Sequence, residues 1–276
     1  MGAANFLPDE VLGRLREGML IPYLGPGVTA LGAPAIPVSD AELATFLGDR
    51  VALPRRARGN LWAAAQFIES RRHRKALVSL MSEAYALPAP PVPMQHWLAG
   101  LRPSMIVDTW YDGAMRAALA GTGQDWGEIQ GITRAGIGEA RWYRAYDHAG
   151  AEAAIGAAPG WRTLLYKPHG GVTPAHNYLV ADSDYVEVLT EIDIQSPIPD
   201  EVKRRREGRG FLFLGCRFHD QMLRTYARQI MKRSAGPHWA VLPAEPMTRN
   251  ERNFLEQQGI SPIEVPLEEI GRAIAA

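Results

Sequence analysis

The chain has 276 residues, of which 46% are hydrophobic and 22% are charged, and its formal net charge is zero. These values are typical of a globular protein, and the length suffices for one large domain or two small ones. A neutral chain creates no global field that attracts nucleic acid or anionic lipid, so we expect neither as a partner. The basic clusters at residues 55–58, 71–75 and 203–209 are interpreted as exposed helix faces. Only if two of them aligned would they form a patch for a phosphate backbone.

The cysteine content and the lengths of the apolar segments indicate in which cellular compartment the protein is expected. Cys216 is the only cysteine, which excludes an internal disulfide and a cysteine-rich zinc site. No segment approaches the ~20 apolar residues that a membrane-spanning helix needs. Residues 1–9 lack a basic region followed by an apolar core, so no secretory signal is expected. We therefore expect a cytoplasmic protein.

The first part of the chain reads as a helix, a strand and a long helical block. Acidic residues at positions 9 and 10 and a terminating Gly18 predict the first helix. The apolar run at residues 20–24 predicts a strand. Apolar residues at spacings of three and four then predict helices, and we expect residues 40–104 to be a helical insertion between the first two strands.

Strands and helices alternate in the rest of the chain. Strands are expected at residues 105–107, 161–166, 211–214, 239–242 and 262–265, and helices at 113–119, 184–189, 200–207, 219–232, 249–258 and the chain end. The glycine-rich stretch 121–160 has only weak periodicity, and no element is assigned there. Helices between strands imply a mostly parallel sheet. We predict one α/β domain over residues 1–276, with a Rossmann-like sheet and helices on both faces.

The strand at residues 20–24 ends in a turn with two glycines, Gly25-Pro26-Gly27-Val28-Thr29. Glycine has no Cβ, so an anion can approach the backbone amides of such a turn. In an open α/β sheet, a nucleotide pyrophosphate commonly binds at this position. Because the turn matches the dinucleotide fingerprint only in part, a plain strand-ending turn is an equal alternative when the turn is taken alone. Residues 30–37 are expected to form a loop.

Three more predicted strands end in polar or glycine-rich residues, at positions 109–112, 169–171 and 215–216. The carboxyl ends of parallel strands lie at one edge of a sheet, so these turns and the first one can converge on one ligand. The convergence of the four turns, and not any single turn, indicates a binding site.

Five ordered blocks of the chain resemble the SIR2-like superfamily. The blocks are residues 25–29, 105–119, 167–170, 184–189 and 213–220. They are similar, in that order, to its Gly-Ala-Gly-Val/Ile-Ser loop, Thr-Asn-Tyr-Asp strand and helix, Lys-Leu-His-Gly motif, Asp-Tyr helix and Phe-hydrophobic-Gly-Tyr motif. The resemblance is to zinc-free NAD-consuming or NAD-binding members, since one cysteine cannot build the four-thiolate site of the zinc-bearing deacylases.

The resemblance implies binding of NAD, NADP or a related nucleotide, action at the nicotinamide–ribose bond, and no metal. His169 would be the general base, and Asp112 would hold the glycine turn or the ribose. The turn would hold phosphates through its amides, and Gly215 and Cys216 would pass under the adenosine half. A homo-oligomer is also implied. The implied cofactor-binding residues are Gly25, Pro26, Gly27, Val28, Thr29, Trp110, Tyr111, Gly170, Gly215 and Cys216.

The chemistry of imidazole agrees with the role of His169. Cleavage of the nicotinamide–ribose bond passes through an oxocarbenium-like state, as in other glycosyl cleavages. A neutral imidazole with a pKa near ~6.5 can take a proton from a ribose hydroxyl or from water. Taken alone, a histidine before two glycines is interpreted as a turn residue. The four other blocks favour the role of general base for His169.

Trp110 stands where the family has the asparagine of Thr-Asn-Tyr-Asp. An indole offers one N–H donor and no acceptor, so it cannot replace an amide that positions the ribose or the attacking water. Its ring could fill the nicotinamide pocket, or it could be a plain core aromatic. Asn177 is the nearest spare amide among the motif blocks. The alternative function is therefore a catalytically impaired nucleotide-binding sensor or a partner-assembly scaffold.

For two further patterns, a cysteine with a nearby histidine and an acidic run, we favour a structural role over a functional one. Cys216 and His219 could be a nucleophile and its base, but a small buried residue at a strand end is favoured. An acidic run could bind a metal ion, but a solvated helix face is favoured; its members are Asp182, Asp184, Glu187, Glu191 and Asp193.

Overall fold

The computed structural model describes residues 7–133, 141–191 and 197–276. Its strands are β1 (Leu20–Leu24), β2 (Met105–Asp108), β3 (Trp126–Gly131), β4 (Tyr143–Asp147), β5 (Glu152–Ala153), β6 (Thr163–Lys167), β7 (Gly170–Gly171), β8 (Asn177–Tyr178), β9 (Gly210–Leu214), β10 (His238–Val241) and β11 (Ile260–Ile263). Its α-helices are α1 (Asp9–Arg16), α2 (Pro26–Ala30), α3 (Asp40–Arg50), α4 (Leu61–Ala84), α5 (Pro93–Gly100), α6 (Ala114–Ala120), α7 (Asp182–Glu191), α8 (Asp200–Arg206), α9 (Gln221–Met231), α10 (Arg249–Gln257) and α11 (Leu267–Ala275).

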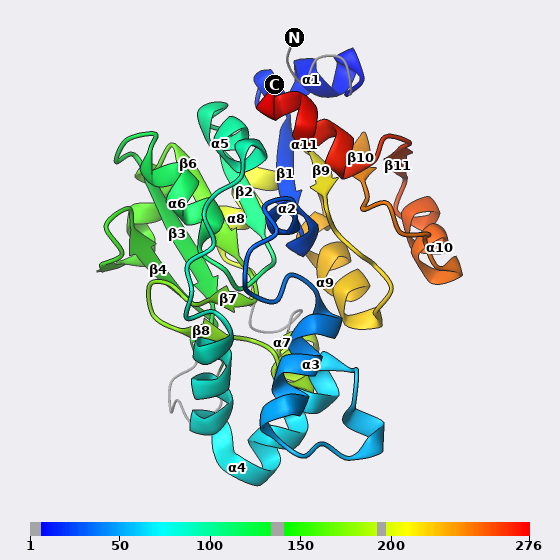
Figure 1. The fold of residues 1–276 in the computed structure, drawn as a ribbon. Coiled ribbons are helices and arrows are strands. Elements are labelled where there is room, and N and C mark those ends of the chain that lie inside the picture. The colour runs from blue at the N-terminus through cyan, green and yellow to red at the C-terminus, as the bar shows by residue number, and fades with distance from the viewer. Residues whose placement is uncertain (1–6, 134–140, 192–196) are drawn as a thin grey trace.

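The centre of the fold is a nine-stranded sheet with the order β11-β10-β9-β1-β2-β6-β3-β4-β5 (Figure 1). The strands from β11 to β3 in this order pair in parallel, and β4 and β5 add antiparallel pairs at one edge. β7 and β8 form a separate two-stranded ribbon. The prediction of a Rossmann-like, mostly parallel α/β sheet is confirmed.

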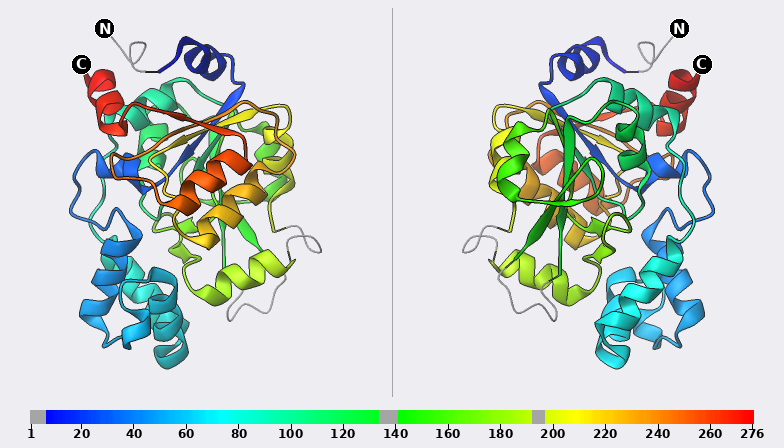
Figure 2. Two further views of the ribbon diagram at one scale, coloured as in Figure 1. Left: turned by 90° about the vertical axis from the view of Figure 1, so that its right-hand side faces the viewer. Right: turned by 90° about the vertical axis from the view of Figure 1, so that its left-hand side faces the viewer.

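Apolar side chains on both faces of the sheet explain why helices cover both sides. In β1, Leu20 and Leu24 belong to one core cluster, whereas Ile21 and Tyr23 belong to the other. The first cluster also contains side chains of α1, α5, α6 and α11, and the second contains side chains of α8, α9 and α10. Figure 2 shows these helices on opposite sides of the strands. A strand buried on both faces is apolar throughout, as the runs in β1 and β9 are.

The helical insertion forms a layer beyond the carboxyl edge of the sheet. Figure 1 shows α3 and α4 at this end of the molecule, away from the strands, and α4 packs against α7. The backbone of α4 is interrupted at His73, where φ is 67°. Within the predicted insertion, α5 returns to the sheet and packs against α6 and α11. The part that projects beyond the sheet is therefore residues 40–84.

The stretch 121–160, to which the sequence assigned no element, contains β3, β4 and β5. β3 carries Glu128 and Gln130, and both side chains are fully buried. The guanidinium of Arg116 pairs with the Glu128 carboxylate at 2.5 Å, and the Gln130 side-chain amide donates to the same residue at 2.6 Å. Polar side chains can be buried in β3 because other elements supply their hydrogen-bond partners. The strand therefore lacks the apolar run by which a buried strand is predicted from the sequence.

The basic clusters are only partly exposed, so the expectation of exposed helix faces is wrong for several of their arginines. Arg205 is buried, and its guanidinium donates to the carbonyl oxygens of Ala158 at 2.9 Å and of Trp161 at 2.6 Å. Arg206 donates to two carbonyls in the last turn of α9. Arg74 pairs with the Asp184 carboxylate at 2.8 Å. Arg205 and Arg206 thus join elements by donating to several carbonyl oxygens, which the five N–H donors of a guanidinium allow.

Among the residues that the structure describes, no helix is both long enough and apolar enough to cross a bilayer.

Candidate functional site

A cavity of about 920 Å³, here called the main cavity, lies at the carboxyl ends of β9, β1, β2 and β6. These four strands are neighbours, and the chain order reverses between β1 and β9, which is where ligands bind in open α/β sheets. The volume is at the upper end of the ~300–1,000 Å³ of small-molecule sites. The predicted site residues that line it are Gly25, Pro26, Gly27, Trp110, Tyr111, His169, Gly215 and Cys216.

Four other predicted site residues do not line the main cavity: Val28, Thr29, Asp112 and Gly170. The hydroxyl of Thr29 donates to Asp112 Oδ2 at 3.0 Å, and Asp112 Oδ1 accepts from the Ala114 amide at 2.8 Å. Asp112 thus connects α2 to the start of α6. Of the two roles that the resemblance implied for Asp112, this geometry supports holding the glycine turn.

The glycines of the two central turns pack directly against each other. A Cβ on Gly25 would lie 2.4 Å from the carbonyl oxygen of Gly215, and a Cβ on Gly27 would lie 2.8 Å from the same atom. Gly215 has a φ of +64°, which also favours glycine. The close approach of β1 and β9 at this edge therefore requires that these positions lack side chains.

Several amides of the glycine turn already have acceptors. The amide of Gly25 donates to Leu214 O at 2.9 Å, that of Gly27 to Gly215 O at 3.0 Å, and that of Val28 to Gly25 O at 3.2 Å. Pro26 has no N–H. A phosphate held by these amides would have to displace hydrogen bonds of the fold.

The short helix α2 was not predicted from the sequence. It begins directly at Pro26, a residue suited to the first helical position.

His169 is buried, with 2% of its surface exposed, and lines the main cavity. Its Nδ1 lies 3.1 Å from the hydroxyl oxygen of Tyr185, which itself donates to Leu179 O at 3.1 Å. With the Tyr185 proton donated to Leu179 O, the Tyr185 oxygen accepts from Nδ1–H of His169, and Nε2 carries the lone pair. Burial, together with the charge of Lys167, lowers the pKa of His169 to about 3. The imidazole is therefore neutral at physiological pH.

Lys167 stabilises the turn between β2 and α6 through hydrogen bonds from its ammonium group. Its buried ammonium donates to Asp108 Oδ2 at 2.6 Å, Trp110 O at 2.5 Å and Asp112 O at 3.0 Å. Burial by itself would lower the pKa of Lys167, but the nearby carboxylates, Asp108 first among them, raise it above its ordinary value. The lysine was part of the Lys-Pro-His-Gly block in the sequence, and no role was assigned to it there.

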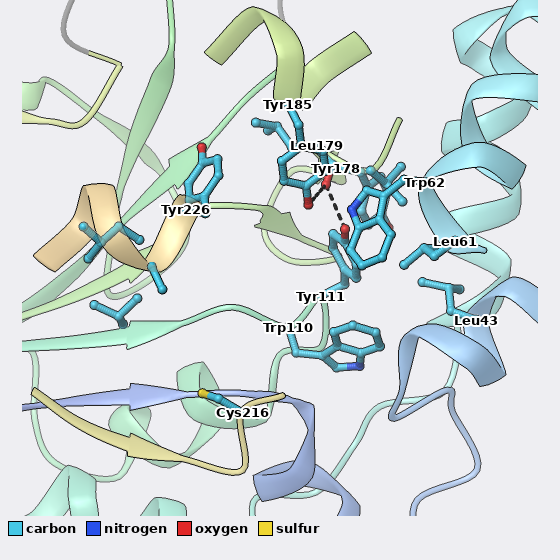
Figure 3. Close-up of a cluster of buried hydrophobic side chains, with 14 of the residues drawn as sticks. Leu43, Leu61, Trp62, Trp110, Tyr111, Tyr178, Leu179, Tyr185, Cys216 and Tyr226 are labelled. Atoms are coloured by element: carbon cyan, nitrogen blue, oxygen red, sulfur yellow. Dashed lines mark hydrogen bonds between the residues drawn. The ribbon is translucent and has the colours of Figure 1, made fainter. Parts of the chain in front are cut away.

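The indole of Trp110 packs among aromatic rings and the helical insertion (Figure 3). Its ring lies 5.3 Å from that of Tyr111 and 6.5 Å from that of Tyr85, and its Nε1 donates to Pro37 O at 2.9 Å. The only donor of the indole is thus used by the backbone.

Asn177, the nearest spare amide in the sequence, does not take the place of the missing asparagine. Its side-chain amide donates to Gln130 and Tyr146, and Asn177 does not line the main cavity.

The pairing of Cys216 with His219 is absent from the described contacts. Cys216 is buried in the turn after β9, with its Sγ 3.5 Å from Tyr23 O of β1, and burial raises the pKa of its thiol. His219 Nε2 instead lies 2.8 Å from Asp40 Oδ2 at the start of α3. The favoured interpretation, a small buried residue at a strand end, agrees with this position.

The acidic run in and after α7 has a capping role at its start. Asp184 Oδ2 accepts from the amides of Val180 at 3.0 Å and Ala181 at 3.1 Å. The side chains of Glu187 and Glu191, and Asp193 as a whole, lie outside the described residues. Within the described ranges, no group of three or more His, Cys, Asp or Glu side chains is arranged to hold a metal ion.

Sequence reasoning missed several side chains of the main cavity. Asp40 and Trp62 reach it from the helical insertion, Tyr185 from α7, and Arg217 and Glu245 from the loops after β9 and β10. Arg217 is fixed by Glu251, with Nε 2.7 Å from Oε1. Only Tyr185 carried a signal, as part of the block that resembles the family's Asp-Tyr helix.

Comparison with known proteins agrees with this geometry. A family model described as a SIR2-like domain matches residues 104–263, which is more than half of the chain. The matched region includes the turns after β2, β6 and β9. No curated protein matches the chain. SIR2-like domains generally bind NAD. From the matched region and the α/β fold, we conclude that the chain belongs to the SIR2-like family.

Proposed function

We propose that the chain binds NAD, NADP or a related dinucleotide in the main cavity and cleaves its nicotinamide–ribose bond, with His169 as general base. The observation that carries this proposal is the position of His169. Its neutral imidazole lines the same cavity as Gly25 and Gly27, although Gly27 and His169 are 142 positions apart in the sequence. Four neighbouring strand ends thus contribute to one site, as dinucleotide binding requires.

The main cavity fits an elongated ligand. It is lined by Tyr185 of α7 and by Gly271 and Arg272 of α11, and these helices lie far apart in Figure 1. In this assignment the nicotinamide ribose lies beside His169, and the adenosine half lies over Gly215. Because three amides of the glycine turn are already bonded and Arg217 is paired with Glu251, the guanidinium of Arg272 is the better phosphate donor in this cavity.

The tautomer of His169 suits the role of base. Nδ1–H is held by Tyr185, so the lone pair of Nε2 is the one that can accept a proton from a ribose hydroxyl or from water. A pKa of about 3 makes the imidazole a weak base in the cavity by itself. Negative phosphates of a bound dinucleotide would favour the imidazolium form and raise this pKa.

The second candidate function is nucleotide binding without turnover, in a sensor or a scaffold. The observation that favours it is the hydrogen bond from Trp110 Nε1 to Pro37 O, which leaves the indole without a polar group for the ribose or for water. The role of the resembling asparagine then has no substitute at this position.

Nicotinamide release from NAD and from NADP separates the two candidates. We expect release by the unmodified protein, and a loss of about 10²-fold or more in His169→Ala with nucleotide affinity nearly unchanged, as for the loss of a general base. The matched control is His96→Ala, at an exposed histidine outside the cavity. Calorimetry measures the binding. Binding without release supports the second candidate, and unchanged release in His169→Ala rejects the base.

The variant Trp110→Asn tests whether the indole limits turnover. If the missing amide is the cause, nicotinamide release rises in this variant. The substitution also empties a buried aromatic site, which costs about 3–5 kcal/mol of stability, so release is compared below the melting temperature of the variant. A folded Trp110→Asn protein without any gain in release removes this explanation.

The domain organisation and the oligomeric state of the chain are also part of the proposal. We propose that residues 1–276 form one domain and that the chain assembles into a homo-oligomer. Light scattering of the purified protein measures the mass of the assembly, and a monomer at all concentrations would reject the second statement.

A further inference from the structure

The helical insertion carries a local excess of positive charge, which the neutral net charge of the chain conceals. Residues 51–75 contain seven Lys or Arg residues and one acidic residue, Glu69. Because the chain as a whole is neutral, the remaining residues carry a net negative charge. Such a separation of charge along a chain points to a polyanionic partner for the basic part.

Six of these seven cations are exposed, and none of the six lies within ion-pair distance of a carboxylate in the part of the chain that the structure describes; they are Arg55, Arg56, Arg58, Arg71, Arg72 and Lys75. Arg74 differs, because its guanidinium pairs with the carboxylates of Glu69 at 3.1 Å and Asp184 at 2.8 Å. The charges of the six exposed side chains thus remain available to a partner.

The two clusters that contain these cations lie at the same end of the molecule. Residues 55–58 include the short 3₁₀-helix η2 (Arg55–Ala57), which packs against α4, and residues 71–75 flank the interruption of α4 at His73. Figure 1 shows the segment between α3 and α4 and the bend of α4 at the end farthest from the sheet. The first arm of α4, residues 61–72, lies between the clusters and is about 17 Å long. The two clusters together are here called the basic tip.

The spacing and the residue types of the basic tip suit a nucleic-acid duplex. A duplex carries one negative charge per ~1.7 Å of its axis, so a length of about 17 Å presents about ten charges to the two clusters. Five of the six exposed cations are arginines. A planar guanidinium can bind a phosphate through two parallel N–H bonds, whereas an ammonium acts as a point charge.

The side chains around the cations disfavour a single strand and a membrane surface. Single-stranded nucleic acid is bound by stacking on exposed aromatic rings, whereas Trp62 is buried and Phe67 is half-buried. A helix at a membrane surface inserts large apolar side chains among the lipids. Within the described ranges, the exposed large hydrophobic side chains all lie outside residues 51–75. The surroundings of the basic tip therefore favour contact with the phosphates of a duplex.

We propose that the basic tip binds double-stranded nucleic acid through its phosphate backbone, without preference for base sequence. Contacts to phosphates position a duplex but carry no sequence information. The neutral net charge, from which no nucleic-acid partner was expected, does not prevent this contact, because exposed charges act only over about 8–10 Å at physiological salt. The inference does not depend on the function of the main cavity.

Fluorescence anisotropy with a labelled DNA duplex of about 20 base pairs measures the binding. We expect saturable binding, with affinities equal within about threefold for two unrelated sequences. The logarithm of the binding constant should fall with the logarithm of the salt concentration, with a slope between about −3.5 and −5.5 for four to six phosphate contacts. The affinity then falls about 100-fold or more between 50 and 200 mM salt. No saturable binding at the lower salt concentration, or a slope near zero, would overturn the proposal.

The triple variant Arg71→Gln, Arg72→Gln, Lys75→Gln removes three charges of the basic tip. We expect its affinity for the duplex to fall at least tenfold and its melting temperature to stay unchanged, because the three side chains are exposed. The matched control is the triple variant Arg228→Gln, Arg249→Gln, Arg252→Gln. It removes the same charge from exposed positions of α9 and α10, which lie beside the sheet. Equal losses in both triple variants would show that net charge, and not the basic tip, holds the duplex.

The double variant Arg55→Gln, Arg56→Gln tests whether both clusters contact one duplex. Its affinity should also fall, and wild-type affinity would reject the shared surface. A single strand of the same sequence should bind less tightly than the duplex, and equal or tighter binding would reject the duplex as partner. Flotation with phosphatidylcholine vesicles that contain about 30% phosphatidylserine tests the membrane. Binding to these vesicles without binding to the duplex would assign the basic tip to a membrane and overturn the proposal.

Discussion

The hydroxyl of Tyr185 and Nδ1 of His169 form a hydrogen bond of 3.1 Å between α7 and the turn after β6. The same hydroxyl donates to Leu179 O, and so does the hydroxyl of Tyr111, at 2.8 Å (Figure 3). One carbonyl thus orients two phenols, and one of these phenols contacts Nδ1 of the imidazole. The side chain proposed as base is held by a residue that is distant from the glycine turn in the sequence.

Tyr185→Phe removes the acceptor of the Nδ1 proton, so His169 is no longer restricted to one tautomer. If His169 is the base, we expect nicotinamide release to fall roughly tenfold, equivalent to one hydrogen bond, with a smaller change in KM. Tyr111→Phe is the matched control, because it loses a bond to the same carbonyl without touching His169. Nitrogen NMR of the imidazole gives an independent measurement. A proton on Nε2 in the unmodified protein would contradict the assignment.

The lowered pKa of His169 predicts how stability depends on pH. The folded pKa is about 3, whereas an unfolded histidine titrates near ~6.5. Below pH ~6.5 the unfolded chain binds a proton that the folded chain excludes, so the free energy of unfolding falls as the pH falls, by at most ~1.4 kcal/mol per pH unit.

The variant His169→Gln should lose this slope between pH ~6.5 and ~5. Urea unfolding at several pH values measures it, and His96→Gln, at an exposed position, is the control. Equal slopes in the unmodified protein and in His169→Gln would show that His169 is protonated or accessible in the folded state.

Gly25→Ala tests the packing of the turns after β1 and β9. The new Cβ would lie 2.4 Å from Gly215 O, a contact that only a backbone shift can relieve. We expect a loss of stability of about 1–3 kcal/mol, as for other overpacked sites, and weaker nucleotide binding. Gly13→Ala is the control, because no atom lies within 4 Å of its Cβ and the residue is inside α1. That variant should gain about 0.5–1 kcal/mol. Equal effects of the two substitutions would contradict the close approach.

The pair of Asp40 and His219 connects the helical insertion to the segment after β9. Its hydrogen bond, first of all, raises the pKa of His219 above the ordinary value. A raised pKa means that the pair stabilises the fold below pH ~6.5 and that this contribution is lost as the pH rises through the pKa of the folded state. Both side chains are about one-third exposed, so the contribution is at most ~1 kcal/mol.

Asp40→Asn should return the pKa of His219 toward its ordinary value. Proton NMR titration of the imidazole measures this change, and Asp49→Asn, on the same helix and outside the main cavity, is the control. If the pKa of His219 is the same in all three proteins, the pair does not form in solution.

Strands buried on both faces were predictable because burial of that kind demands an apolar run. Residues 20–24 gave β1 with its observed bounds, and residues 211–214 gave β9 except for its first residue. β3 was not predictable, since Glu128 and Gln130 are polar and yet fully buried. Their partners, Arg116 and Asn177, come from α6 and from β8. Local pattern alone cannot reveal that a polar side chain will be satisfied by a distant element.

The sequence by itself determined the α/β fold, because apolar runs that alternate with amphipathic helices can bury their surfaces only in layers. It also determined that the turns containing Gly25 and His169 lie at one edge of the sheet, since parallel strands align their carboxyl ends. Only the tertiary structure decided which turn amides already have acceptors, that Nδ1 of His169 contacts the Tyr185 hydroxyl, and that Trp110 uses its donor on Pro37. These properties depend on hydrogen bonds and burial between residues far apart in the chain, which no local pattern contains.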